Sequence, residues 1–142
     1  MRSNTISAPA APTAPAPEVP CKRIIVAVDD LFFLAKIQET ARQLGVRIEC
    51  LRSNREILEA AEALPALIIF DLNGNAKPLA TIAKIRRQAR LKKIALIGFV
   101  SHLQAELKMQ AQEAGCDLVM PRSAFSQNLP ALLRRHGLPE SE

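Results

Sequence analysis

Residues 24–30 of the chain read IIVAVDD, five apolar residues followed directly by two aspartates. Two further runs, Ala66–Phe70 and Ile94–Val100, are apolar at nearly every position and have about the length of a strand. Strands that are apolar on both faces belong in a parallel sheet that helices cover on each side. Two weaker segments, Val46–Leu51 and Asp117–Met120, complete a set of five predicted strands.

The segments between these strands have the pattern of amphipathic helices. Apolar residues recur at helical spacing from Leu34 to Leu44, and Gly45 follows as a suitable C-cap. The later helices have residues suited to their starts: Asn54 as the cap of the second, Pro78 in the first turn of the third, Ser101 with Gln104 as a capping box for the fourth, and Ser126 or Asn128 at the start of a short fifth. A strand and a helix thus alternate five times. This order predicts an α/β fold, a doubly wound five-stranded parallel sheet of the flavodoxin-like (βα)5 type.

Composition indicates one domain with a tail. The 142 residues suit a single domain, and 49% apolar and 23% charged residues are ordinary globular values. Residues 1–20 differ, because they hold five of the ten prolines and otherwise little but alanine and small polar residues. Such a stretch buries too little surface to offset chain entropy. We therefore expect a disordered Ala/Pro-rich tail at 1–20, one domain at 21–138 and a short C-terminal tail at 139–142.

The remaining composition excludes several classes of protein. No apolar run approaches the ~18 residues that a membrane span needs. Three cysteines are an odd number without the spacing of a disulfide framework or a zinc site, which favours a reducing compartment, the cytoplasm. Five phenylalanines with no tryptophan or tyrosine argue against a base-stacking nucleic-acid module.

Charged residues are predicted to meet at one edge of the sheet. Ligands of doubly wound folds bind beyond the carboxyl ends of the strands. Asp29 and Asp30 follow the first predicted strand, and Asp71 follows the third. Gly98 lies near the end of the fourth strand, and Arg122 follows the fifth. Three carboxylates and one guanidinium that are far apart in the sequence should therefore come together.

These carboxylates can have a chemical or a structural role. Packed together they repel one another, so the pKa of each rises unless a cation neutralises them. Magnesium suits such a group because it prefers oxygen ligands and often bridges to a phosphoryl group, and a carboxylate can itself become an aspartyl phosphate. The structural alternatives are that Asp29 or Asp30 only caps the first helix, and that Asp71 is only a turn residue before Asn73 and Gly74.

Three motifs in register resemble bacterial response-regulator receiver domains. Residues 24–30, IIVAVDD, look like the first strand and acidic pair of that family. Residues 68–73, IIFDLN, look like its third strand with the phospho-accepting aspartate, and residues 114–117, AGCD, resemble the turn before its fifth strand. The resemblance covers roughly residues 22–136 with matching element order. It implies the receiver version of the predicted fold.

The resemblance also implies roles for individual residues. Asp71 would accept a phosphoryl group from a histidine kinase or a phosphotransfer protein. Asp29 and Asp30 would hold Mg2+ together with Asp71, and Asn73 would add its backbone carbonyl. Arg122 stands at the position of the family's lysine, which contacts the phosphate.

Departures from the family pattern fall in its switch region. The family has Thr or Ser at the end of the fourth strand, where the hydroxyl bonds the phosphoryl oxygen, and the matching position here is Gly98, followed by the bulky Phe99. The aromatic switch residue of the fifth strand is matched by Val119 or a neighbour, and none of these is Tyr or Phe. The family's Lys-Pro is replaced by Arg122 with the proline one place earlier, and this arginine can pair with Asp71 in the free protein. The resemblance therefore predicts a preserved acidic pocket with a degenerate switch.

A basic stretch lies outside the predicted pocket. Between Lys77 and Lys93 the chain has seven basic residues and no acidic one. Charge runs are usually solvated helix faces. The alternative is an electropositive patch for an acidic protein or a nucleic acid.

These observations predict a signalling module and not a multiple-turnover enzyme. The leading hypothesis is a stand-alone receiver domain in phosphorelay signal transduction that acts through protein contacts. Its partners would be a histidine kinase or phosphotransfer protein and a downstream protein, with no membrane and no nucleic acid at physiological salt. The main alternative is a pseudo-receiver, a docking module that works without phosphorylation. A nucleic-acid-binding accessory domain is a further alternative.

Overall fold

The chain is described by a computed structural model that covers residues 23–74, 77–101 and 104–137. Its sheet contains five parallel strands in the order β2-β1-β3-β4-β5, the order of flavodoxin-like folds. The strands are β1 (Ile24–Ala27), β2 (Ile48–Cys50), β3 (Leu67–Asp71), β4 (Ala95–Val100) and β5 (Leu118–Pro121). The predicted α/β fold with a doubly wound parallel sheet is confirmed. The predicted tails at 1–20 and 139–142 lie outside the described residues.

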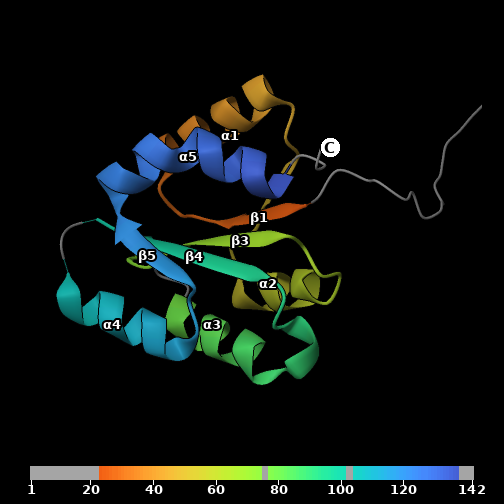
Figure 1. The fold of residues 1–142 in the computed structure, drawn as a ribbon, viewed down its shortest axis with the longest axis vertical. Coiled ribbons are helices and arrows are strands. Elements are labelled where there is room, and N and C mark those ends of the chain that lie inside the picture. Colours follow the sequence, from red (N-terminus) through yellow and green to blue (C-terminus); the bar gives the residue numbers. More distant parts are fainter. Residues whose placement is uncertain (1–22, 75–76, 102–103, 138–142) are drawn as a thin grey trace, which may run out of the picture.

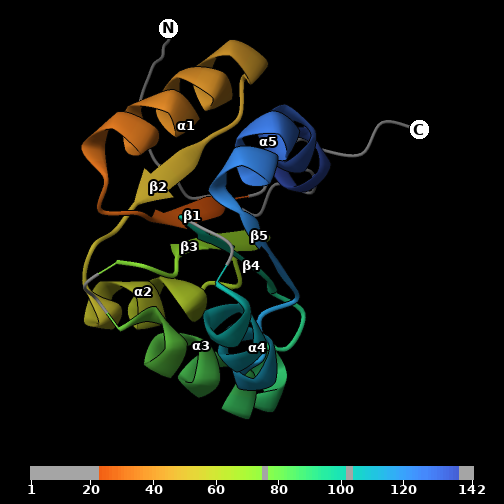
Figure 2. The same ribbon diagram turned by 90° about the vertical axis from the view of Figure 1, so that its left-hand side faces the viewer.

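Helices cover both faces of this sheet. They are α1 (Leu31–Leu44), α2 (Asn54–Ala61), α3 (Pro78–Arg87), α4 (Ala105–Ala114) and α5 (Arg122–Gly137), with a short 3-10 helix η1 (Ala89–Leu91) after α3. Figure 1 shows α1 and α5 on one face and α2, α3 and α4 on the other, and Figure 2 shows the same layers after a quarter turn. No helix in the described part of the chain has the length and apolar character to cross a membrane.

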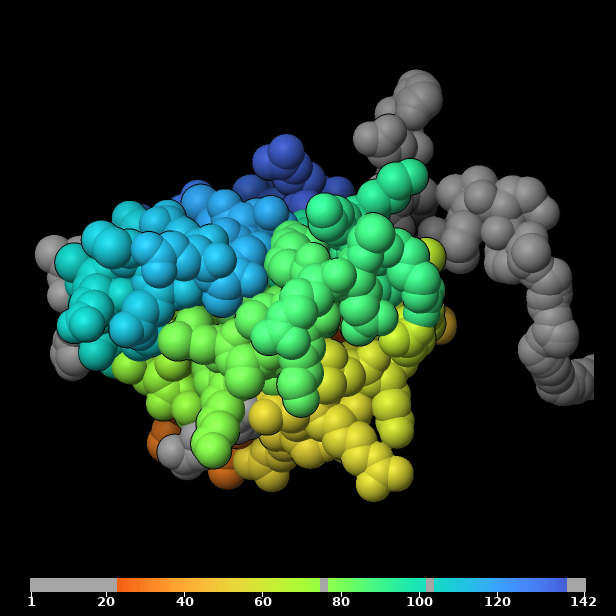
Figure 3. All heavy atoms as spheres, turned by 90° about the horizontal axis from the view of Figure 1, so that it is seen from below, coloured from red at the N-terminus to blue at the C-terminus, as the bar shows by residue number. Residues whose placement is uncertain are grey.

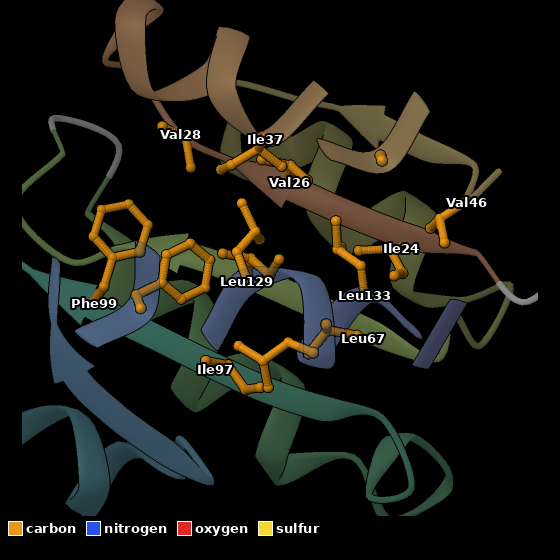
Figure 4. Packing of buried hydrophobic residues seen from close by; sticks show 14 of the residues in the cluster. Ile24, Val26, Val28, Ile37, Val46, Leu67, Ile97, Phe99, Leu129 and Leu133 are labelled. Carbon is orange, nitrogen blue, oxygen red and sulfur yellow. The ribbon is translucent and has the colours of Figure 1, made fainter. Parts of the chain in front are cut away.

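The core consists of two layers, one on each face of the sheet. Successive residues of β1 show the division, because Ile24 and Val26 pack toward α1 and α5 while Ile25 packs toward α2 and α3. Figure 4 shows the first layer, where Ile37 of α1 and Leu133 of α5 lie against strand residues. Each large apolar side chain buried in this way stabilises the fold by about 1.5–3 kcal/mol. This two-sided burial explains why the strands have continuous apolar runs.

The predicted caps of α2 and α4 are wrong. Ser53, not Asn54, caps α2, because its hydroxyl accepts a hydrogen bond from the backbone N–H of Glu56 at 3.1 Å. Asn54 instead begins the helix, and its Oδ1 accepts the hydroxyl of Thr81 in α3 at 2.6 Å. Ser101 does not cap α4, whose cap position is occupied by Gln104 without a side-chain hydrogen bond.

The fifth helix is longer than predicted. It begins at Arg122, immediately after β5, and neither Ser126 nor Asn128 starts it. Phe125 and Leu129 are both buried and are one helical repeat apart, so apolar packing continues the helix through two residues that favour caps. This early start places Arg122 at the carboxyl edge of the sheet.

Candidate functional site

The carboxyl edge of the sheet brings the three predicted aspartates together. Asp71 is the last residue of β3, and Asp29 and Asp30 lie in the turn between β1 and α1. Asp71 is 6% exposed, and its Oδ1 accepts the backbone N–H of Asn73 at 3.0 Å. Burial raises the pKa of Asp71 and outweighs the opposing effects of that N–H and of Arg122, while the charges of Asp29 and Asp30 raise it further. The three carboxylates are therefore within electrostatic reach of one another, as predicted.

Asp30 has a structural role within this group. Its Oδ1 accepts the backbone N–H groups of Phe32 at 3.0 Å and Phe33 at 3.1 Å, so it caps α1. The N–H of Phe33 lowers the pKa of Asp30, and Arg122 lowers it further against the effect of desolvation. The alternative interpretation that one aspartate of the pair caps the first helix is confirmed for Asp30.

Arg122 is held by Asp30 and by two aromatic rings. Its Nη1 lies 3.0 Å from Asp30 Oδ2, and its guanidinium carbon lies 4.9 Å from the ring centroid of Phe33 and 5.6 Å from that of Phe99. Phe99 in turn stacks on Phe125, with 4.8 Å between centroids. The Nε of Arg122 is buried and has no hydrogen-bond partner among the described residues. The prediction that Arg122 pairs with Asp71 is wrong, because Asp30 and the rings provide a closer set of contacts.

Asn73 connects two loops at the edge of the pocket. Its side-chain amide donates to Gln104 Oε1 at 2.9 Å, and its Oδ1 accepts the backbone N–H of Ser101 at 2.7 Å. The loop after β3 is thus fastened to the loop after β4. The family resemblance implies a role only for the backbone carbonyl of Asn73, and the sequence gives no sign of its side-chain contacts because the partners lie 28 and 31 positions away.

A small cavity lies beside the aspartates. Its walls include Asp29, Asp71 and Gly74, together with Arg52 from the loop after β2. A Cβ atom at Gly74 would lie 3.1 Å from both Asp29 Oδ2 and the backbone oxygen of Asp71, so a side chain here would crowd the Asp29 carboxylate. Sequence reasoning did not identify Arg52 as a site residue, because no motif or spacing connects it with the pocket.

The strand register corrects the predicted switch position. Gly98 pairs with Phe70, whereas Asp71 pairs with Phe99. A Cβ atom at Gly98 would point at Leu72, at 2.8 Å from Cδ1, and so to the opposite face of the sheet from Asp71. The fourth strand ends two residues later at Val100, which is buried and also has no hydroxyl. The strand end therefore has no hydroxyl group, but Gly98 is not the residue responsible.

The aspartates have the ligand atoms that a divalent cation needs, but their side chains are not arranged around a common site. Carboxylate oxygens are the ligands that magnesium prefers. In the described ranges, however, no three His, Cys, Asp or Glu side chains are grouped closely enough to hold a metal ion. Asp30 is directed to Arg122 and to the first turn of α1. The predicted set of Asp29, Asp30, Asp71 and Asn73 is thus not a formed coordination shell.

Comparison with solved structures identifies the fold. No protein-family model and no curated protein matches the sequence. Among solved structures, a phosphorylated cyanobacterial phytochrome response regulator, RcpA, superimposes with a TM-score of 0.71 at 17% identity, over 86% of this chain and 100% of that one. The chain has the receiver fold.

Two further receiver structures extend the comparison. A chemotaxis response regulator of Vibrio cholerae gives a TM-score of 0.69 at 18% identity, covering 82% of this chain and 98% of its own. The receiver domain of a sensor histidine kinase from Pseudomonas aeruginosa, with magnesium in its active-site cleft, gives 0.70 at 18% identity over the same shares. The superpositions show a shared receiver fold, and the bound magnesium is a property of the Pseudomonas aeruginosa domain.

Proposed function

We propose that this receiver fold is a phospho-accepting domain of a phosphorelay, with Asp71 as the acceptor. The observation that carries the proposal is the buried Asp71 carboxylate at the end of β3, within electrostatic reach of Asp29 and Asp30. One carboxylate oxygen would attack the phosphorus of a phosphohistidine, the bond from phosphorus to the imidazole nitrogen would break, and an aspartyl phosphate would form. A histidine kinase or phosphotransfer protein, in the cytoplasm, would supply the phosphoryl group.

Asp29 and Asp71 are the side chains that would hold magnesium during this transfer. Asp30 would join them after exchanging its contact with Arg122, and Asn73 would contribute its backbone carbonyl. The ion would neutralise charge that develops on the phosphoryl oxygens. Other residues position the acceptor. The backbone N–H of Asn73 orients the Asp71 carboxylate, and Gly74 has no side chain to crowd the adjacent space.

Labelling by a small phosphodonor tests this proposal. The purified chain, incubated with acetyl phosphate and magnesium, should gain one phosphoryl group by intact-mass measurement. Asp71→Asn should abolish labelling, whereas Glu106→Gln, which removes an exposed carboxylate from α4, should leave it unchanged. A folded Asp71→Asn protein that is still labelled would place the acceptor elsewhere.

The second candidate function is a docking module that works without phosphorylation. It is favoured by the contacts of Arg122, whose cation is already engaged by Asp30 and by Phe33, and by a fourth strand that ends without a hydroxyl at Val100. In that case the wild-type chain would remain unlabelled in magnesium and acetyl phosphate. Its binding to a partner would be the same in Asp71→Asn.

A further inference from the structure

The basic stretch from Lys77 to Lys93 is divided by the structure into engaged and unengaged cations. Arg86 donates to the backbone oxygens of Gly115 and Lys92 and pairs with Asp117 at 2.6 Å. Arg90 pairs with Glu62. These two residues hold the fold together and do not contribute free charge to the surface.

Five other cations of this stretch are exposed and have no ion pair among the described residues: Lys77, at the start of α3, and a group of four nearer the end of that helix. Lys84 and Arg87 lie one helical turn apart on α3, and Lys92 and Lys93 follow η1. None has an ion pair or side-chain hydrogen bond within residues 23–74, 77–101 and 104–137. We call these four residues the basic strip. In Figure 3 the green segment that contains them crosses one face of the molecule between α4 and α2.

The basic strip is not neutralised by any ion pair in the described part of the chain. The sequence has no acidic residue from Asn73 to Ala105. Two acids from neighbouring elements, Glu62 and Asp117, are paired with Arg90 and Arg86, and no acid among the described residues forms an ion pair with the strip. The strip thus concentrates four positive charges in a chain whose formal net charge is +5. Such a local field attracts and orients an acidic partner.

The basic strip lies at the opposite edge of the sheet from the acidic pocket. The helix α3 begins after β3 at the pocket, and its last turn leads through η1 to the first residue of β4, Ala95. In a parallel sheet the amino ends of the strands are at the edge away from the carboxyl ends. A partner on the strip would therefore leave Asp71 accessible.

We propose that the basic strip is a docking surface for an acidic segment of a protein partner. A nucleic acid fits this surface less well, because base stacking needs aromatic side chains and all five phenylalanines of the chain lie elsewhere in the sequence. Carboxylates spaced along an extended segment can match the four cations without any groove. The contact is independent of the phosphorylation of Asp71, since the two sites occupy opposite edges.

Fluorescence anisotropy of the full chain with a labelled poly-glutamate peptide tests this proposal. The strip variant carries Lys84→Gln, Arg87→Gln and Lys93→Gln. The control variant carries Arg47→Gln, Arg134→Gln and Arg135→Gln. These changes remove the same charge from exposed residues directly before β2 and in the last turn of α5. At low salt, where screening is weak, we expect the strip variant to bind at least about tenfold more weakly than wild type and the control variant to bind within about threefold.

Three outcomes would overturn the proposal. They are an equal loss in both variants, no binding by the wild type at low salt, and binding of a DNA duplex that is tighter than that of the peptide and is weakened in the strip variant. Thermal unfolding followed by circular dichroism verifies that both variants are folded. Asp71→Asn should bind the peptide like wild type, so this measurement separates docking at the strip from the proposed phosphotransfer.

Discussion

The guanidinium of Arg122 pairs with Asp30, with 3.0 Å between Nη1 and Oδ2, and lies over the rings of Phe33 and Phe99. The other oxygen of the same carboxylate, Oδ1, caps α1. Asp30 and Arg122 therefore join the first turns of α1 and α5. The charge of Arg122 lowers the pKa of Asp71, but the burial of Asp71 raises that pKa by more. Asp30 and the two rings thus hold Arg122 beside the proposed acceptor, Asp71, and not in contact with it.

Removing the Arg122 side chain should destabilise the fold. Arg122→Ala loses the contacts with Phe33 and Phe99 and leaves Asp30 without its ion pair, so we expect the free energy of unfolding to fall by about 1–2 kcal/mol. Urea unfolding measures this change. Arg134→Ala, an exposed arginine of the same helix, should change it by less than about 0.5 kcal/mol. Equal effects of the two substitutions would contradict the importance of the ring contacts.

Asp71→Asn should make the protein more stable at neutral pH. The pKa of Asp71 is raised in the folded protein, so between the unfolded value of about 3.9 and the folded value the folded chain binds more protons than the unfolded chain. Stability therefore falls as the pH rises through this window and stays lower above it. An asparagine at position 71 does not ionise, so the variant does not lose stability in this way.

Thermal unfolding at several pH values measures the difference. The melting temperature of Asp71→Asn should exceed that of wild type at pH 7, and the gap should narrow as the pH falls toward about 4. A variant that is no more stable than wild type at pH 7 would show that the carboxylate is not penalised in the folded state.

A phosphoryl mimic should cause only local changes. Beryllofluoride on Asp71 stands in for the phosphoryl group, and it has no hydroxyl to contact at the end of β4 and no aromatic residue to move at Val119. A ligand shifts a conformation only through contacts that differ between two states. We expect amide chemical shifts to change around Asp71 and Asn73 and to stay constant in α4 and β5. Widespread changes in those two elements would refute the degenerate switch.

A side chain at Gly98 should destabilise the core and not activate the switch. In Gly98→Ala the new Cβ meets Leu72 Cδ1 at 2.8 Å, so Leu72 must move and the free energy of unfolding should fall by about 1–3 kcal/mol. Leu72→Ala alone creates a cavity. The double variant should lose less than the sum of both, because the added methyl group occupies part of that space. Strict additivity would contradict this contact.

Arg86 and Arg87 provide a matched pair for the basic stretch. Arg86→Ala removes the hydrogen bonds to Gly115 and Lys92 and the ion pair with Asp117, which also accepts the backbone N–H of Leu96 at 2.8 Å. We expect a loss of about 1–3 kcal/mol in the free energy of unfolding. Arg87→Ala should cost less than about 0.5 kcal/mol, because that side chain is exposed and unpaired in the described part of the chain. Similar losses from both substitutions would contradict the assigned roles.

The sequence by itself predicted the fold and the edge at which charged residues meet. Continuous apolar runs such as Ile94–Val100 need burial on both faces, and only a parallel sheet between helix layers provides it. Asp71 and the pair Asp29 and Asp30 follow such runs directly, so their positions at the carboxyl edge follow from strand direction alone. Local signals were less reliable at helix starts, because α5 begins at Arg122 through the packing of Phe125 and Leu129.

Only the tertiary structure decided which groups contact one another at that edge. Arg122 lies beside Asp30 across 92 positions of sequence, and Asn73 reaches Ser101 and Gln104 across two loops. The register that pairs Asp71 with Phe99, and directs Gly98 to the other face, depends on how two strands align. Periodicity reports the average burial of a segment, and a strand shifted by one residue reverses the faces of its side chains without altering that average. Pairwise contacts therefore depend on the packed register of the whole sheet.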